Sequence, residues 1–179
     1  MTDKISIREA VIEDAASLLE FIHALAEYEH LEDQVEATVE GLRRTIFIDK
    51  RAEVLIAEYA GQAAGFALFF HNYSTFKGKP GIYLEDLFVK PELRGNGIGR
   101  ALLQKLAGIA ARRGCGRLEW ACLDWNAPSI AFYRGVGASP LSDWTIYRVT
   151  EDKFMKLGKS IGNPPALPGD SKSLTFPGI

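Results

Sequence analysis

One segment, residues 84–112, constrains the fold of this chain more than any other. It starts with an apolar strand pattern, breaks at Lys-Pro-Glu-Leu, and continues as Arg-Gly-Asn-Gly-Ile-Gly at 94–99 into a helix with apolar residues at helical spacing. Glycines let backbone N–H groups approach an anion, and the start of a helix adds partial positive charge. The segment therefore predicts a socket for a pyrophosphate between a strand and a helix.

The spacing of the glycines separates this turn from two common nucleotide sites. A P-loop needs Gly-x-x-x-x-Gly-Lys-Ser/Thr, and the Gly-Lys-Ser at 158–160 has Lys153 where the first glycine should stand. The dinucleotide pattern Gly-x-Gly-x-x-Gly fails as well, because Arg100 or Leu102 holds the place of its third glycine. What fits is Arg-x-x-Gly-x-Gly. Taken alone, such a turn also suits a tight strand-to-helix connection.

Composition limits the classes of partner. With 179 residues, 47% hydrophobic and 25% charged, the chain suits one globular domain. A net charge of -2 argues against nucleic acid as the main partner, and the apolar runs are too short for a membrane span. Two cysteines suit a reducing compartment, and three histidines lack metal-ligand spacing. We therefore expect a cytoplasmic protein without metal.

Hydrophobic periodicity predicts the order β-α-α-β-β-β-α-β-α-β, a mixed sheet flanked by helices in the α/β (α+β) class. After Gly158 the chain becomes rich in proline and glycine, so we expect one domain over 1–158 and a tail over 159–179. The expected strands are 5–8, 54–59, 64–70, 82–89, 118–122 and 144–149, and the expected helices are 13–31, 36–48, 98–113 and 126 to about 135.

The turn at 94–99 resembles the pyrophosphate loop of the GNAT superfamily of N-acetyltransferases. Other short motifs occur in order at family spacing over roughly residues 4–157, and together they resemble the diamine acetyltransferase branch, which includes spermidine/spermine and thialysine N-acetyltransferases. These motifs are Ala-Glu-Tyr-Glu at 26–29, Asp-Gln-Val at 33–35, Tyr-Leu-Glu-Asp at 83–86, Asp-Trp-Asn at 124–126 and Ala-Phe-Tyr at 131–133.

The resemblance implies a GNAT fold with a mostly antiparallel mixed sheet of six to seven strands and about four helices. It implies acetyl-coenzyme A as cosubstrate. It also implies a homodimer with acceptor sites near the subunit boundary. The residues that match the cofactor-binding positions are Leu87, Phe88, Val89, Arg94, Gly95, Asn96, Gly97, Ile98, Gly99, Arg100, Asn126, Ser129 and Tyr133.

Acetylation of an amine requires a neutral nitrogen, whereas an alkylammonium group has a pKa of roughly 10.4. At pH 7 only about one molecule in a few thousand is neutral, so a base must help to remove the proton. Glu85, just before the turn, is the carboxylate we expect in this role, although it could act only by attracting the ammonium group. Tyr133 matches the general acid of the family, which protonates the leaving sulfur. Alternatively, Tyr133 is an ordinary buried aromatic residue with no part in the chemistry.

The acceptor is less defined than the cofactor. Tyr28, Glu29, Phe76, Glu85, Asp86 and Trp144 match positions of the acceptor site, where acids hold ammonium groups and aromatics hold the chain. Asp86 follows Glu85 directly, so only a local bulge could bring both into one site. Ser74 stands where the spermidine/spermine branch has an aspartate. Diamines and small amino acids with a side-chain amine both stay possible.

Two other functions compete with amine acetylation. A non-enzymatic acyl-coenzyme A sensor needs the turn at 94–99 but neither Glu85 nor Tyr133, so the presence of both residues argues against it. Acetylation of a protein lysine or N-terminus needs an open groove. The acids and aromatics expected around residues 72–81 favour a closed pocket instead.

Overall fold

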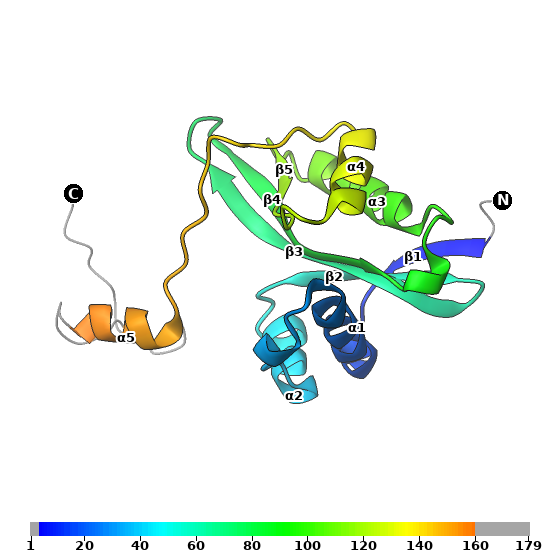
Figure 1. Ribbon diagram of the computed structural model, residues 1–179, viewed down its shortest axis with the longest axis horizontal. Helices are drawn as coiled ribbons and strands as arrows, with labels where there is room; N and C mark the ends of the chain where they lie inside the picture. The colour runs from blue at the N-terminus through cyan, green and yellow to red at the C-terminus, as the bar shows by residue number, and fades with distance from the viewer. Residues whose placement is uncertain (1–3, 160–179) are drawn as a thin grey trace. The chain divides into compact units, whose positions relative to one another are not determined.

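The computed structural model describes residues 4–159, and the chain divides into two compact units, Met1–Gly137 and Ala138–Ile179. All five strands and four of the five α-helices belong to the first unit (Figure 1). The elements are β1 (Ile5–Glu9), α1 (Ala15–Glu29), α2 (Val39–Leu42) with a π-helical continuation (Arg43–Ile48), β2 (Glu53–Tyr59), β3 (Gln62–Ser74), β4 (Lys79–Val89), α3 (Ile98–Arg112), β5 (Leu118–Trp120), α4 (Ala127–Gly135) and α5 (Glu151–Lys159).

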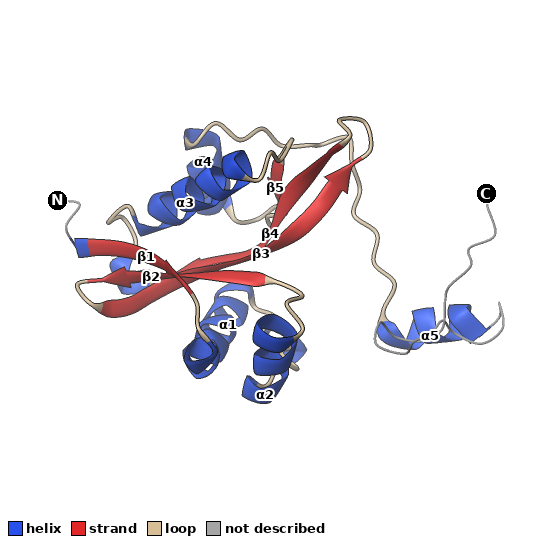
Figure 2. Ribbon diagram, turned by 180° about the vertical axis from the view of Figure 1, so that it is seen from behind, coloured by secondary structure: helices blue, strands red, loops and turns tan. Residues whose placement is uncertain are grey.

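The strands form one sheet in the order β1-β2-β3-β4-β5. Three pairs are antiparallel, and β5 joins β4 in parallel. Figure 2 shows α1 and α2 on one face of this sheet and α3 and α4 on the other. The mixed, mostly antiparallel character expected from the sequence is therefore confirmed for the described residues.

Each face of the sheet carries its own core. The α3 face buries Leu84 against Leu102, Leu106 and Ile109, which recur along α3 at helical spacing. The α1 face buries aromatic rings, including Phe21 stacked on Phe66 with centroids 5.9 Å apart. Since helices cover both faces of the middle strands, these strands are apolar on both sides.

A β-bulge in β4 changes which side chains face which core. Phe69 pairs with Leu84 and Leu68 pairs with Asp86, so Glu85 has no partner on β3. Leu84 lies in the core beneath α3, whereas Phe88, four residues on, lies in the core beneath α1. In a regular strand both residues would face the same side. A bulge of the kind that could bring both Glu85 and Asp86 into one site is therefore present at Glu85.

The pairing of β4 with β5 is short. It covers Ile82–Leu84 opposite Leu118–Trp120 and then stops, while β4 continues to Val89 along β3. β3 and β4 stay close beside this gap because Gly65 has no Cβ, which would overlap the carbonyl oxygen of Phe88. The end of β4 thus keeps one neighbour and has an open edge on the other side.

The sheet has five strands in the described residues, fewer than the six to seven expected. The missing strand is 144–149, which forms neither helix nor strand. A strand exists only when a neighbouring edge pairs its N–H and C=O groups, and an alternating sequence specifies no such edge. Trp144, Ile146 and Tyr147 are 74%, 74% and 90% exposed.

The helices differ less from expectation. The helix expected over 36–48 begins at Val39, where the Thr38 side chain accepts a hydrogen bond from the Gly41 N–H, and continues as a π-helix. The C-terminal helix α5 was not expected. The expected tail lies outside the described residues except for Lys159.

Among residues 4–159, no helix combines the length and the apolar character needed to cross a membrane.

Candidate functional site

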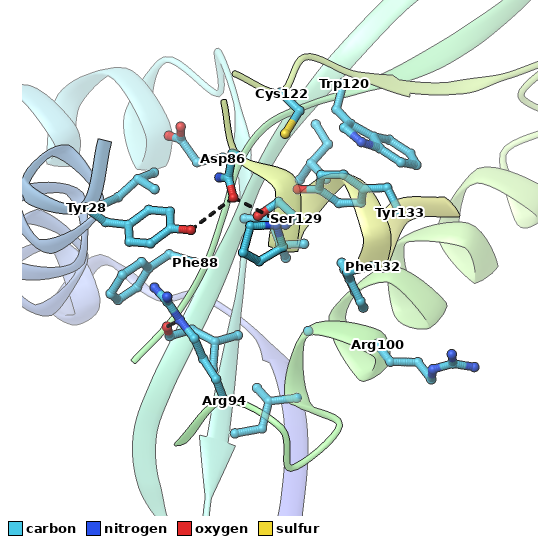
Figure 3. Close-up of a pocket in the computed structure, with 18 of the residues that line it drawn as sticks. Tyr28, Asp86, Phe88, Arg94, Arg100, Trp120, Cys122, Ser129, Phe132 and Tyr133 are labelled. Carbon is cyan, nitrogen blue, oxygen red and sulfur yellow. Dashed lines mark hydrogen bonds between the residues drawn. The ribbon is translucent and has the colours of Figure 1, made fainter. Parts of the chain in front are cut away.

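A cavity of about 500 Å³ opens in the first unit where β4 and β5 separate. Its walls come from the C-terminal end of α1, the end of β4, the turn before α3, the end of β5 and the start of α4 (Figure 3). The lining residues are Leu25, Tyr28, Glu29, Leu84, Glu85, Asp86, Leu87, Phe88, Val89, Leu93, Arg94, Gly95, Gly97, Ile98, Gly99, Arg100, Trp120, Ala121, Cys122, Asn126, Pro128, Ser129, Phe132 and Tyr133.

The turn before α3 has the geometry of an anion site. Gly95 and Gly97 adopt φ angles of 80° and 86°, which glycine reaches without the strain that a Cβ would cause. Asn96 braces the turn from outside the cavity, because its Nδ2 donates to the Leu93 carbonyl at 3.0 Å. The first N–H groups of α3 have no acceptor within the helix and add to its partial positive charge.

Arg94 is held beside this turn by two neighbours. Its Nε donates to the Val89 carbonyl at 3.0 Å, and its guanidinium lies 4.4 Å from the centre of the Tyr28 ring. Tyr28 belongs to the last turn of α1, which ends where His30 adopts a left-handed backbone with φ of 60°. The end of α1 therefore contacts the anion-binding turn.

Asn126 joins α1 to α4. It is the N-cap of α4, and its Oδ1 accepts hydrogen bonds from the Ser129 N–H at 3.2 Å and the Tyr28 hydroxyl at 3.0 Å. Figure 3 marks both bonds and shows Tyr28 reaching across the cavity from α1. Asn126 is 5% exposed, so the bonds are shielded from water.

Tyr133 lies seven residues beyond Asn126 on α4 and also faces the cavity, as two helical turns require. Its ring packs against Trp120, with centroids 5.0 Å apart, and against Phe132 at 5.3 Å. Burial raises the pKa of the Tyr133 hydroxyl, and negative charge at Cys122 and Glu29 raises it further. The hydroxyl therefore keeps its proton at neutral pH.

Three carboxyl groups gather at the other end of the cavity, away from the anion-binding turn. Burial raises the pKa of Asp86 to about 6, with smaller contributions from Glu85 and Glu29. Burial also raises the pKa of Glu29. Within residues 4–159, neither Asp86 nor Glu29 forms an ion pair with a basic side chain. A cationic ligand would supply the missing partner.

The cavity brings together most of the residues expected from the sequence. Three lie outside its lining: Asn96 braces the turn, Phe76 is 98% exposed on the β3–β4 hairpin, and Trp144 belongs to the second unit, where it is 74% exposed. No group of three or more His, Cys, Asp or Glu side chains in the described part of the chain could hold a metal ion.

Several lining residues were not expected from the sequence. Trp120 is the last residue of β5 and the last one paired with β4, and Ala121 and Cys122 follow it beyond the end of the pairing. Leu25 lies about one turn before Tyr28 and Glu29 on α1, a spacing that could have identified it. The other unexpected lining residues are Leu84, Leu93, Pro128 and Phe132.

The sequence and the fold match known proteins. The model of the acetyltransferase (GNAT) family matches residues 15–138. A thialysine N-epsilon-acetyltransferase from Bos taurus is 39% identical over 165 residues, which cover 86% of this chain and 96% of the relative. An L-ornithine N5-acetyltransferase from Arabidopsis thaliana is 37% identical over 127 residues, covering 70% of this chain and 53% of the relative.

The fold also matches a solved structure along nearly its whole length. An integron cassette protein from the mobile metagenome of V. cholerae superposes with a TM-score of 0.72 at 27% sequence identity. The alignment covers 87% of this chain and 98% of that protein.

The raised pKa of Asp86 predicts how stability depends on pH. The folded protein holds this proton up to about pH 6, whereas the unfolded chain releases it near 3.9. The stability linked to this group is therefore full below about pH 4 and is lost as the pH rises through 6. The Asp86→Asn variant does not lose this stability, because an amide side chain has no proton to release. We expect the free energy of unfolding of the variant, relative to wild type, to rise by about 2 to 3 kcal/mol between pH 4 and pH 7.

Urea unfolding at several pH values checks this expectation, with the small difference expected below pH 4 as the internal control. A difference between variant and wild type that stays constant from pH 4 to pH 7 would contradict the raised pKa.

Proposed function

This chain belongs to the GNAT acetyltransferase family, and from that premise we propose that it transfers the acetyl group of acetyl-coenzyme A to the primary amine of a small molecule. The observation that carries the proposal is one cavity with an anion-binding turn at one end and, at the other, carboxyl groups that have no basic partner among residues 4–159. A diphosphate fits the first end and an ammonium group the second.

The residues at the first end fit coenzyme A. The positive-φ turn at Gly95 and Gly97 and the start of α3 suit its diphosphate, with Arg94 beside them. The open edge of β4 and the amide of Asn126 suit its pantetheine arm, an extended chain with two amide groups. Leu87, Phe88, Val89 and Ser129 line this path.

Acetyl-coenzyme A supplies an activated acetyl thioester, and the protein must supply a neutral amine beside it. Ionised amines outnumber neutral ones at pH 7, a deficit of roughly 4 to 5 kcal/mol. Glu85, the bulged residue of β4, lines the cavity and accepts the proton of the ammonium group, directly or through a water molecule. The nitrogen then attacks the acetyl carbonyl.

Two groups assist the carbonyl and the leaving sulfur. A backbone N–H of Phe88 or Val89, at the open edge of β4, polarises the acetyl carbonyl. Tyr133 donates its proton to the sulfur as the carbon–sulfur bond breaks. The ammonium group loses two protons in all: one restores the Tyr133 hydroxyl, and the other, taken up by Glu85, passes to solvent. The raised pKa of Tyr133 keeps its proton in place until the carbon–sulfur bond breaks.

The acceptor is a small primary amine, a diamine or an amino acid of the thialysine or ornithine kind. Glu29, Asp86 and Glu85 face its cationic groups, and Tyr28 lies beside Glu29 on α1. Ser74 is not among the lining residues of the cavity; it is 6% exposed, and its hydroxyl accepts a hydrogen bond from the Lys77 N–H at 3.3 Å. Relatives named for thialysine and ornithine support the amino-acid class.

A screen of amines tests the proposal. Release of the coenzyme A thiol is measured with spermidine, putrescine, thialysine, lysine and ornithine, with N-acetylated forms of the same amines as controls. We expect at least one amine to raise thiol release well above the rate without acceptor, because the carboxyl groups recognise its ammonium group. Equal rates with and without every amine would overturn the proposal.

A variant at Tyr133 tests the acid. Tyr133→Phe keeps the ring contacts with Trp120 and Phe132 but removes the proton. We expect kcat to fall about 100- to 10,000-fold, the range of a lost general acid, while the Kd for acetyl-coenzyme A stays within about twofold. Tyr59→Phe is the matched control, since Tyr59 lies outside the cavity. Unchanged kcat in Tyr133→Phe would remove Tyr133 from the mechanism.

We also propose that the chain forms a homodimer. The described part of the second unit, residues 138–159, has no buried side chain. Leu141, Trp144, Ile146, Tyr147 and Val149 are 62%, 74%, 74%, 90% and 54% exposed. Apolar side chains at this density mark an interaction surface.

Light scattering after size-exclusion chromatography checks the dimer. We expect a mass about twice the 19.8 kDa of one chain, and a shift toward one chain in Ile146→Asp, because a charge at a covered apolar position is costly. Ile48→Asp is the control, since Ile48 is an exposed apolar residue of the first unit. A wild-type mass near 20 kDa at tens of micromolar would contradict the dimer.

A further inference from the structure

We propose that Tyr28 is a positioning residue for the acyl carrier: its hydroxyl holds the amide of Asn126 so that Nδ2 faces the cavity as a hydrogen-bond donor to the pantetheine arm. The inference rests on the proposed function, because it takes coenzyme A as the ligand. Tyr28 is assigned to the cofactor by this contact, whereas the sequence placed it with the acceptor.

The orientation of the Asn126 amide follows from its neighbours. The Ser129 backbone N–H can only donate, so the atom that it meets at 3.2 Å must be Oδ1. The Tyr28 hydroxyl meets the same oxygen at 3.0 Å and therefore donates as well. Two donors on Oδ1 leave Nδ2 on the other side of the amide, and a flipped amide would place its N–H groups against the Ser129 N–H.

The amide nitrogen has no acceptor in the described part of the chain. The hydrogen bonds of Asn126 use its Oδ1, its backbone N–H and its carbonyl, and none uses Nδ2. The residue is 5% exposed and lines the cavity. Nδ2 is not among the fully buried side-chain atoms that lack a partner, so it is open to the cavity and can donate to an acceptor there. The carbonyl groups of the pantetheine arm are acceptors of the right kind.

Tyr28 is suited to this role because it is fixed from several sides. Its ring lies against the guanidinium of Arg94 at 4.4 Å and against the ring of Trp125, with centroids 5.9 Å apart. Figure 3 shows Tyr28 between Arg94 and the start of α4. One side chain thus contacts both the residue beside the diphosphate turn and the residue that binds the arm.

The next residue on α1 serves the other substrate. Consecutive helical residues point about 100° apart, so Tyr28 and Glu29 face different parts of the cavity. Burial raises the pKa of Glu29, in line with a carboxyl group that lacks a cationic partner. Tyr28 therefore fits the cofactor end and Glu29 the acceptor end.

Binding of two ligands to Tyr28→Phe tests the inference by calorimetry. Acetyl-coenzyme A carries the pantetheine arm, and 3′-phosphoadenosine 5′-diphosphate has the same nucleotide and diphosphate without the arm. The variant keeps the ring beside Arg94 but loses the hydroxyl. We expect the Kd for acetyl-coenzyme A to rise about fivefold, the value of one hydrogen bond, and the Kd for the nucleotide to stay within about twofold.

Two further variants separate the hydroxyl from the ring. Asn126→Ser keeps an oxygen to cap α4 but removes Nδ2. If Tyr28 acts through Asn126, the double variant binds acetyl-coenzyme A no more weakly than Asn126→Ser alone. Tyr28→Leu removes the ring from Arg94 as well, so both ligands bind more weakly. Tyr59→Phe, outside the cavity, binds both as wild type does.

Three results would overturn the inference: an unchanged affinity of Tyr28→Phe for acetyl-coenzyme A, an equal loss for both ligands, or losses that add in the double variant. Failure of the premise that coenzyme A is the ligand gives a different result, because wild type would then bind neither ligand. Failure of acetyl transfer alone appears in the amine screen and leaves both affinities unchanged. Binding of the nucleotide by Tyr28→Phe shows that the variant is folded.

Discussion

The gap between β4 and β5 is the constraint on which the rest of the site depends. Pairing stops at Leu84 opposite Trp120, so the last residues of β4 have an open edge and β5 turns away toward α4. A ladder continued to Val89 would fill the cavity with backbone. The same gap faces the start of α3 and the last turn of α1, so one interruption of pairing brings together groups from five elements.

Charge divides the cavity into two ends. At one end the glycine turn and the start of α3 present N–H groups, with Arg94 beside them; at the other, Glu29, Glu85 and Asp86 gather with raised pKa values at two of the three. Each end alone is costly to bury and each suits a ligand of opposite charge. With a diphosphate at one end and an ammonium group at the other, the acyl group of the carrier and the amine would meet near Tyr133, whose neutral hydroxyl avoids adding charge between them.

The features that local chemistry dictates could be predicted from the sequence. The turn at 94–99 and the helix it opens follow from residue types and spacing, and the structure contains both. The features that depend on a residue far away in the chain could not be predicted from the sequence. Tyr28 and Asn126 are 98 positions apart, so no spacing rule links their hydrogen bond. The alternation at 144–149 predicted a strand, but it could not supply the edge that a strand requires.

Tyr28 also shows why the two ends need not act independently. Its ring lies against Arg94 beside the glycine turn, its hydroxyl donates to Asn126 Oδ1, and its neighbour Glu29 lines the same cavity. Any shift of the last turn of α1 moves all three contacts together, because a helical turn is rigid. Under the proposed function, a carrier bound to Arg94 and Asn126 would therefore also restrain Glu29, because Tyr28 links both residues to the last turn of α1.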